Sequence, residues 1–382
     1  MKCKRAVANE LILCNSLFCC AKSTSTIVGA LQTWSRKSVI RSVMLGGLSP
    51  GHRIIQEKGQ ENPFLFSTFL FTILITMISG TREGGDGMAL QYKVPDYKKV
   101  RVIVDSDAAC EADDPFAIAH ALMCDKFMVK AIFAEHFNCE GSMERSYEEI
   151  QRVLRAMKKE VPVLKGEKGK LEQKAAGELS AAAKFLIEEA LRDEEKPLYV
   201  LCIGAITNIA AAIQECPEIV SRMTVVWIGG QSHEYSTSEV REFNAGNDIE
   251  AANLVLGSGV RFWQIPNDVY GSMRISLAEI QRRIAPCGEI GKHLFEQMES
   301  YNRSERAGWT PGESWTLGDS PAVGVVMDEA CGKFHEAEAP VINEDTTNRF
   351  ESGRPKIRVY TSIDSRFILE DFIAKLECFY GK

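Results

Sequence analysis

From residue 98 onward, short apolar runs alternate with longer amphipathic stretches. The apolar runs are rich in β-branched residues, which is typical of buried strands. We expect strands at Val100–Asp105, Met128–Ala134, Leu198–Ile203, Met223–Gly229, Arg261–Ile265 and Ile357–Ser362. Apolar positions three or four apart predict helices at Phe116–Met123, Met143–Lys158, Leu179–Arg192, Asn208–Gln214, Ile249–Leu256, Leu277–Ile284 and Arg366–Cys378. This alternation predicts an α/β fold, a single domain with a mainly parallel open sheet flanked by helices.

The first 87 residues do not continue this pattern, so we place one domain at 98–382 and a separate leader at 1–87. Residues 63–80 form an uncharged apolar segment of borderline length for a membrane-spanning helix. The leader could be a signal anchor, a targeting segment, or a stretch outside the working protein. Met88 would be a natural start a dozen residues before the first strand. We favour a dispensable or poorly ordered leader, with membrane anchoring through 63–80 as the alternative.

Charge and cysteine content restrict the partners and the compartment. The formal net charge is −7, but residues 1–87 hold ten basic and five acidic side chains, so the remainder has a net charge of −12. An acidic body does not favour nucleic acid as a partner. The 12 cysteines form no CxxC pair and no zinc pattern, which indicates reduced thiols and a cytoplasmic location. An anchor with a basic N-terminal flank would place the body on the opposite side of the membrane, which conflicts with reduced thiols.

Four acids gather where the first apolar run ends: Asp105, Asp107, Asp113 and Asp114. Carboxylates this close repel one another unless a cation lies among them. Ligands of open α/β folds bind at the carboxyl ends of the strands, where this cluster would lie. We therefore expect a site for a hard cation with oxygen ligands. The alternative is structural, with Asp105 forming a turn and Asp113 or Asp114 capping a helix.

Three more polar strings follow strand candidates. IGAITNIA, residues 203–210, comes after LYVLC. A functional turn at the strand end and a plain helix cap at Thr207 or Asn208 explain this string equally well. WIGG, residues 227–230, leads to an EFN string and a helix that we expect Asp248 to cap. Finally, Asp319 precedes an apolar helix, where the simplest role is again a cap.

Taken in order, the strings DxD…DD, GxxTNIA, GG…EFN…DxEAA and a late Asp resemble the nucleoside hydrolases of the inosine–uridine-preferring type. The resemblance covers about residues 98–378. It implies a single α/β catalytic domain that binds one calcium ion and hydrolyses the N-glycosidic bond of ribonucleosides. It also implies a homo-oligomer, since the family is commonly dimeric or tetrameric.

The resemblance assigns roles to individual residues. It implies that Asp107 is both a metal ligand and the base that activates water. The implied metal ligands are Asp107, Asp114, Asp319 and the backbone carbonyl of Ile203. The implied sugar-binding residues are Asp113, Asn138, Glu242 and Asn244.

Three departures affect the half of the site that faces the leaving base. Five residues, 108–112, separate Asp107 from the Asp-Asp pair where the usual motif has three, and they include an extra acid, Glu111. Divergent relatives have an A-x-N-E-x-D-D form of this loop, and Cys110 stands where they have Asn. Many members have His directly before the late aspartate, and this chain has Gly318. Ser236 replaces an asparagine six positions before the EFN glutamate.

Other side chains are weaker candidates for the site. His136 and His233 follow strand candidates, and a solvated loop position is the simpler interpretation of each. Trp315, Tyr301 and Arg303 are candidates for the border of a base pocket, although core packing is the safer interpretation for Trp315.

Two other function classes compete with the hydrolase. DSDAA and GDSP resemble motifs of phosphatases of the haloacid dehalogenase type, but Val323 stands where that family has an acid, and the EFN and TNIA strings would be unexplained. Gly318 motivates a non-catalytic ribose- or nucleoside-binding protein on the same fold. Retention of Asp107 argues against a binder, because a binder needs no base.

Overall fold

The computed structural model describes residues 90–174 and 177–381, which belong to one compact unit. The leader, its apolar segment 63–80 and Met88 lie outside these residues. None of the helices in the described ranges is long and apolar enough to cross a membrane.

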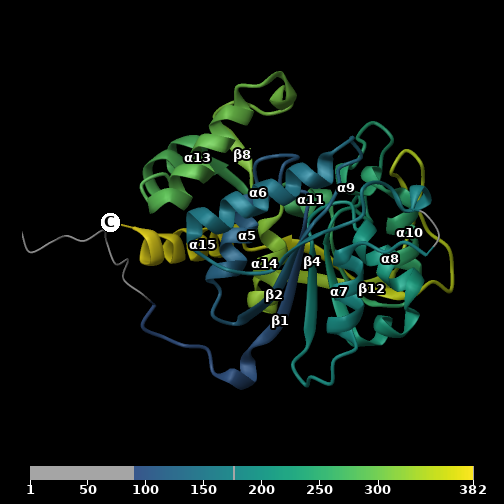
Figure 1. Ribbon diagram of the computed structural model, residues 1–382. Coiled ribbons are helices and arrows are strands. Elements are labelled where there is room, and N and C mark those ends of the chain that lie inside the picture. The colour runs from purple at the N-terminus through teal and green to yellow at the C-terminus, as the bar shows by residue number, and fades with distance from the viewer. Residues whose placement is uncertain (1–89, 175–176, 382) are drawn as a thin grey trace, which may run out of the picture. The chain divides into compact units, whose positions relative to one another are not determined.

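A parallel sheet forms the centre of this unit (Figure 1). Within the described residues its eight strands have the order β3-β2-β1-β4-β5-β6-β12-β9, and only the edge pair β12–β9 is antiparallel. The strands are β1 Val100–Ser106, β2 Phe127–Ala134, β3 Val163–Lys165, β4 Leu198–Cys202, β5 Met223–Ile228, β6 Arg261–Ile265, β9 Gly332–Glu338 and β12 Lys356–Ile363. Two small antiparallel pairs lie apart from it: β7 Arg274–Ser276 with β8 Ser314–Thr316, and β10 Val341–Ile342 with β11 Asn348–Arg349.

The direction in which the strands are added reverses between β1 and β4. The chain builds outward from β1 through β2 to β3, and then returns to place β4 on the other side of β1. The connections that follow β1 and β4 therefore leave to opposite sides, and a crevice opens between them at the carboxyl edge. The acid cluster follows β1, so the topology places it at this reversal.

Helices cover both faces of the sheet, as Figure 1 shows. Side chains of β1 alternate between the two cores: Val102 and Val104 face one and Ile103 faces the other. The first core includes α5 Asp114–Met123, α6 Ser142–Met157, α13 Gly288–Asn302, α14 Ser320–Met327 and α15 Ser365–Tyr380. The second includes α7 Ala181–Ala190, α8 Thr207–Glu215 and α10 Ile249–Gly257. Shorter helices are α9 Phe243–Asn247, α11 Asn267–Tyr270 and α12 Leu277–Glu279, which continues as a π-helical turn at Ile280–Ile284.

The predicted fold class is confirmed. Each predicted strand is present with its ends shifted by no more than one residue. At the edge of the sheet, β9 has largely exposed and charged side chains, which suit an edge strand. The sequence pattern did not predict β3, the β7–β8 pair or α13.

Candidate functional site

Three carboxylates meet at the carboxyl edge of the sheet. Asp113 and Asp114 begin α5, and Asp319 precedes α14, which packs against α5. One carboxylate oxygen of each lies within 4.8 Å of the others, and all three residues are buried. Asp113 and Asp319 stand at N-cap positions, but neither side chain makes a capping hydrogen bond. The structure therefore brings these acids together without the capping contacts that the structural alternative requires.

This group of carboxylates is electrostatically unfavourable as it stands. Burial, together with the charge of Asp113, raises the pKa of Asp114 to about 8. Burial raises the pKa of Asp113 to about 6, although backbone hydrogen bonds oppose the change. Burial and the charges of Asp113, Asp114 and Asp107 raise the pKa of Asp319 well above its usual range. A divalent cation among these oxygens would favour their charged forms.

Asp107 lies beside this group. It is 3% exposed, and its Oδ2 has no hydrogen-bond partner. Burial, followed by the charges of Asp114, Glu111 and Asp113, raises the pKa of Asp107. Across the strand reversal, a Cβ at Gly204 would lie 2.9 Å from Asp107 Oδ1, so only glycine allows this approach. Ile203, directly after β4, donates its N–H to Asp105 O at 2.9 Å, which holds this turn against β1.

Asp105 is the penultimate residue of β1 and precedes the other acids of the cluster. Its Oδ1 accepts a hydrogen bond from Asn208 Nδ2 at 2.8 Å. Its Oδ2 has no hydrogen-bond partner, and its carboxyl group lies near that of Glu135, a buried acid just after β2 that the sequence patterns missed. Burial raises the pKa of Asp105 to about 6, and burial together with Asp105 raises the pKa of Glu135 further. A charged Asp105 therefore opposes ionisation of Glu135. An acid just past a neighbouring parallel strand was the signal for Glu135.

The predicted sugar-binding residues also lie at this edge. Glu242 caps α9 and is fully engaged by protein donors: Gly230 N at 2.9 Å, Ala245 N at 2.8 Å and Tyr270 OH at 2.8 Å. Asn244 donates to Ile228 O at 2.8 Å. Asn138 is exposed just beyond β2 and has a left-handed backbone, with φ of 50°.

Tyr270 lies where the usual histidine would project. A Cβ at position 318 would be 3.2 Å from the Tyr270 ring and 3.3 Å from Asp113 Oδ2. Burial and Glu242 raise the pKa of Tyr270 well above its usual range. The tyrosine thus links Glu242 to the acid cluster, and a histidine at 318 would require it to move. Tyr270 was missed because it ends a four-residue helix without a sequence signal.

The lengthened acid loop is held from outside by α13 and the turn after it. Gln297 Nε2 donates to Ala112 O at 2.7 Å, and Arg306 Nη2 donates to Cys110 O at 2.9 Å. Glu111 faces the cluster, and burial together with Asp113 and Asp114 raises its pKa to about 8, although Arg306 opposes the change. The segment that contains Gln297 and Arg306 therefore sets the position of the two additional loop residues.

The contacts of the remaining candidate residues indicate structural roles. Trp315 is buried and packs against Tyr301, with ring centroids 5.5 Å apart. Arg303 pairs with Glu299 on the surface of α13. Ser236 accepts a hydrogen bond from Asn348 N at 2.9 Å.

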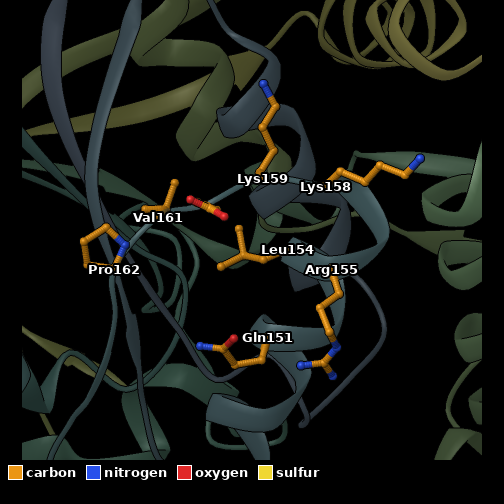
Figure 2. Close-up of a pocket in the computed structure, with 8 residues that line it drawn as sticks. Gln151, Leu154, Arg155, Lys158, Lys159, Val161 and Pro162 are labelled. Atoms are coloured by element: carbon orange, nitrogen blue, oxygen red, sulfur yellow. The ribbon is translucent and has the colours of Figure 1, made fainter. Parts of the chain in front are cut away.

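The hollow drawn in Figure 2 is separate from this arrangement. It has a volume of about 620 Å³ and lies at the end of α6, where Arg155, Lys158 and Lys159 border it. None of the predicted site residues lines it, so we do not assign the predicted chemistry to it.

We expect Arg306→Ala to lower the catalytic efficiency kcat/KM of this site about three- to tenfold, because the acid loop loses one charge-assisted hydrogen bond. Arg303→Ala is the matched control, since it removes an arginine of the same segment that pairs with Glu299 on the surface. Steady-state kinetics of both variants measure the effect. Equal losses in the two variants would show that Arg306 does not position the loop.

Comparisons with known proteins give a consistent result. A sequence model of the family described as inosine-uridine preferring nucleoside hydrolase matches residues 102–370. The pyrimidine-specific ribonucleoside hydrolase RihA of Salmonella agona is 26% identical over 234 residues, which cover 54% of this chain and 74% of that protein. RihA of Salmonella arizonae is 28% identical over 236 residues, covering 55% and 74%.

Solved structures share the fold. A purine-preferring ribonucleoside hydrolase from Gardnerella vaginalis matches with a TM-score of 0.62 and 19% identity, over 74% of this chain and 99% of that one. The plant nucleoside hydrolase PpNRh1 matches with a TM-score of 0.60 and 16% identity, over 73% and 99%. The type III effector XopQ, solved with adenosine diphosphate ribose, matches with a TM-score of 0.57 and 11% identity, over 74% and 95%.

Proposed function

The chain belongs to the inosine-uridine preferring nucleoside hydrolase family, a family of N-ribosyl hydrolases, and on that premise we propose that it cleaves its substrate with a bound calcium ion. The substrate is a ribonucleoside or a related N-riboside, and the products are ribose and a free base. The observation that carries the proposal is the meeting of Asp113, Asp114 and Asp319 in one buried group.

The donor set suits calcium. We assign Asp107, Asp114, Asp319 and the carbonyl of Ile203 as its ligands, and all four offer oxygen, which calcium prefers. A cation would compensate the charge of the buried carboxylates with raised pKa values and of the Asp107 oxygen without a partner. When bound, calcium would make a water molecule more acidic and bind the ribose hydroxyls.

Asp107 is the proposed general base. Its Oδ2 is buried but free of protein donors, so it can accept a proton from an attacking water. Gly204 leaves the space in which this carboxylate lies. The water would then add to the anomeric carbon as the bond to the base breaks, and the base would leave with the electron pair of that bond and take up a proton from solvent.

The sugar is held by Asp113, Asn138, Glu242 and Asn244 in this proposal. The transition state has oxocarbenium character, so the negative charges of Asp113 and Glu242 would stabilise it. Glu242 is fixed by three donors within 2.9 Å, and a carboxylate fixed in advance needs no reorganisation during the reaction.

The rest of the proposal concerns the state of the protein. We propose a cytoplasmic homo-oligomer with residues 98–382 as its catalytic domain and a dispensable leader at 1–87, or a membrane-anchored protein if 63–80 acts as an anchor. The net charge of −12 beyond residue 87 supports a small-molecule substrate rather than nucleic acid.

A reducing-sugar assay across purine and pyrimidine nucleosides tests the function, with and without a calcium chelator. We expect ribose release from at least one nucleoside, lost on chelation and regained with added calcium. Tight nucleoside binding without turnover would instead support the binding protein, and chelator-resistant turnover would exclude the calcium assignment.

A further inference from the structure

Behind the ribose side of the site, three buried side chains connect the ends of β2, β4 and β5. His136 follows β2, Thr207 begins α8 after β4, and Asp248 caps α10 in the segment after β5. They are 0%, 0% and 1% exposed. The expectation that His136 is a solvated loop residue is therefore wrong. None of the three is assigned to the metal, to the attacking water or to the sugar in the proposed function.

The hydrogen bonds run in one direction and define the tautomer of the histidine. Asn138 N–H donates to His136 Nδ1 at 3.1 Å, so Nδ1 carries no proton. His136 Nε2 therefore carries it and donates to Thr207 Oγ1 at 2.8 Å. Thr207 in turn donates to Asp248 Oδ2 at 2.8 Å. Burial lowers the pKa of His136 to about 4, which is consistent with a neutral ring.

Two backbone positions along this chain of bonds have an unusual conformation. Asn138 has φ of 50° and Ile206, next to Thr207, has φ of 70°. A β-branched residue in the left-handed region is a true outlier, and such conformations persist only where the surroundings impose them. Thr207 is tied on both sides by the bonds just described, and its neighbour Asn208 donates to Asp105. The bonds therefore fix the turn that also contains Ile203 and Gly204.

We propose that His136, Thr207 and Asp248 form a positioning relay that holds Asn138 in its left-handed conformation for binding ribose. The inference rests on the proposed function, because it assigns Asn138 to the sugar. None of the three touches substrate in this assignment. Their effect reaches the sugar through the N–H of Asn138 and the turn before α8.

Two substitutions of the same histidine separate its two nitrogens. In His136→Asn the side-chain oxygen can replace Nδ1 as acceptor for Asn138 N–H, but the bond to Thr207 is lost. In His136→Gln the side-chain N–H can replace Nε2 as donor to Thr207, but the acceptor for Asn138 is lost. Each variant removes one buried hydrogen bond, so a purely structural role predicts similar effects of both.

We expect His136→Gln to raise KM about five- to tenfold with kcat within about twofold, because ribose binding weakens in ground and transition state alike. His136→Asn should keep KM within about threefold. In an Asn138→Ala background, His136→Gln should raise KM no further, because the two residues act through one path. Equal KM changes in the two histidine variants, or a full additional rise in the Asn138→Ala background, would overturn the proposal.

Two further measurements keep the proposal testable. One is a second variant, in case the histidine variants do not fold, and the other is independent of the proposed function. Thr207→Val is the second variant, and it should raise KM about two- to threefold, as His136→Asn does at most, without adding to Asn138→Ala. Nitrogen-15 NMR of wild-type histidines reads the tautomer without any substrate. A proton on His136 Nδ1 would overturn the relay even if ribose release is observed, while absence of ribose release with the expected tautomer would overturn only the proposed function.

Discussion

Asp107→Asn should lower kcat for ribose release by about a thousandfold, within the range by which a positioned general base accelerates proton transfer. Asparagine has nearly the same shape but cannot accept the proton of the attacking water. The fold should remain intact, because the lost Oδ2 has no protein partner. Steady-state kinetics with the best nucleoside, together with the thermal midpoint Tm, measure both effects.

Glu111→Gln is the matched control for this substitution. It also neutralises an acid of the same loop whose charge raises the pKa of Asp107, so the electrostatic change is similar. We expect its kcat to fall less than tenfold, because Glu111 is assigned neither to the water nor to the metal. Near-wild-type kcat in Asp107→Asn, or equal losses in both variants, would contradict the assignment of the base.

Calcium titration separates the two roles of Asp107. The Asn variant should bind calcium more weakly, because it lacks one charged ligand. Saturating calcium should not restore kcat if Asp107 also takes the proton. Full recovery at high calcium would show that Asp107 is only a ligand.

Removing the metal should abolish turnover and make stability depend strongly on pH. In the metal-free protein the pKa values of Asp113 and Asp114 are raised to about 6 and about 8. Their values in the unfolded chain are about 4, so the folded state binds more protons in between. Stability of the chelated protein should therefore fall as pH rises from about 5 to about 8.

Calcium should reverse this trend, since it binds only the deprotonated carboxylates. At about a hundred times its dissociation constant it should raise Tm by roughly 5 to 10 °C near pH 8, and by less near pH 5. Scanning calorimetry with chelator and with calcium across this range provides the test. A Tm of the chelated protein that rises between pH 5 and 8 would contradict the proposal that a cation compensates the charge of this acid cluster.

The sequence predicted the parallel sheet well, because its strands are continuous apolar runs flanked by helical periodicity. It did not predict α13, although Ile290, Leu294 and Met298 are buried at a spacing of four. Gly288 and Gly291 weaken the helical pattern there. The helix is stabilised by packing against α6, which no local pattern reports.

Within the site, the acids after β1 could be found because they are close together in sequence and stand at a strand end. Glu135 also follows a strand but stands apart from the cluster in sequence, and Tyr270 and Arg306 offered no such signal. Each reaches the cluster from a different connection, through a contact that exists only once the sheet and its helices are assembled. His136 was underestimated for the same reason, because its partners Thr207 and Asp248 are separated from it in sequence.

The wide separation of Asp114 and Asp319, roughly two hundred residues, has a consequence for biosynthesis. During translation the first acids leave the ribosome long before α14 exists. A nascent chain therefore has to fold its first strands without the proposed calcium ion that would later compensate their charge. Chains released before Asp319 would lack a ligand and bind calcium weakly, so retention on a calcium-dependent column would distinguish completed polypeptides from truncated ones.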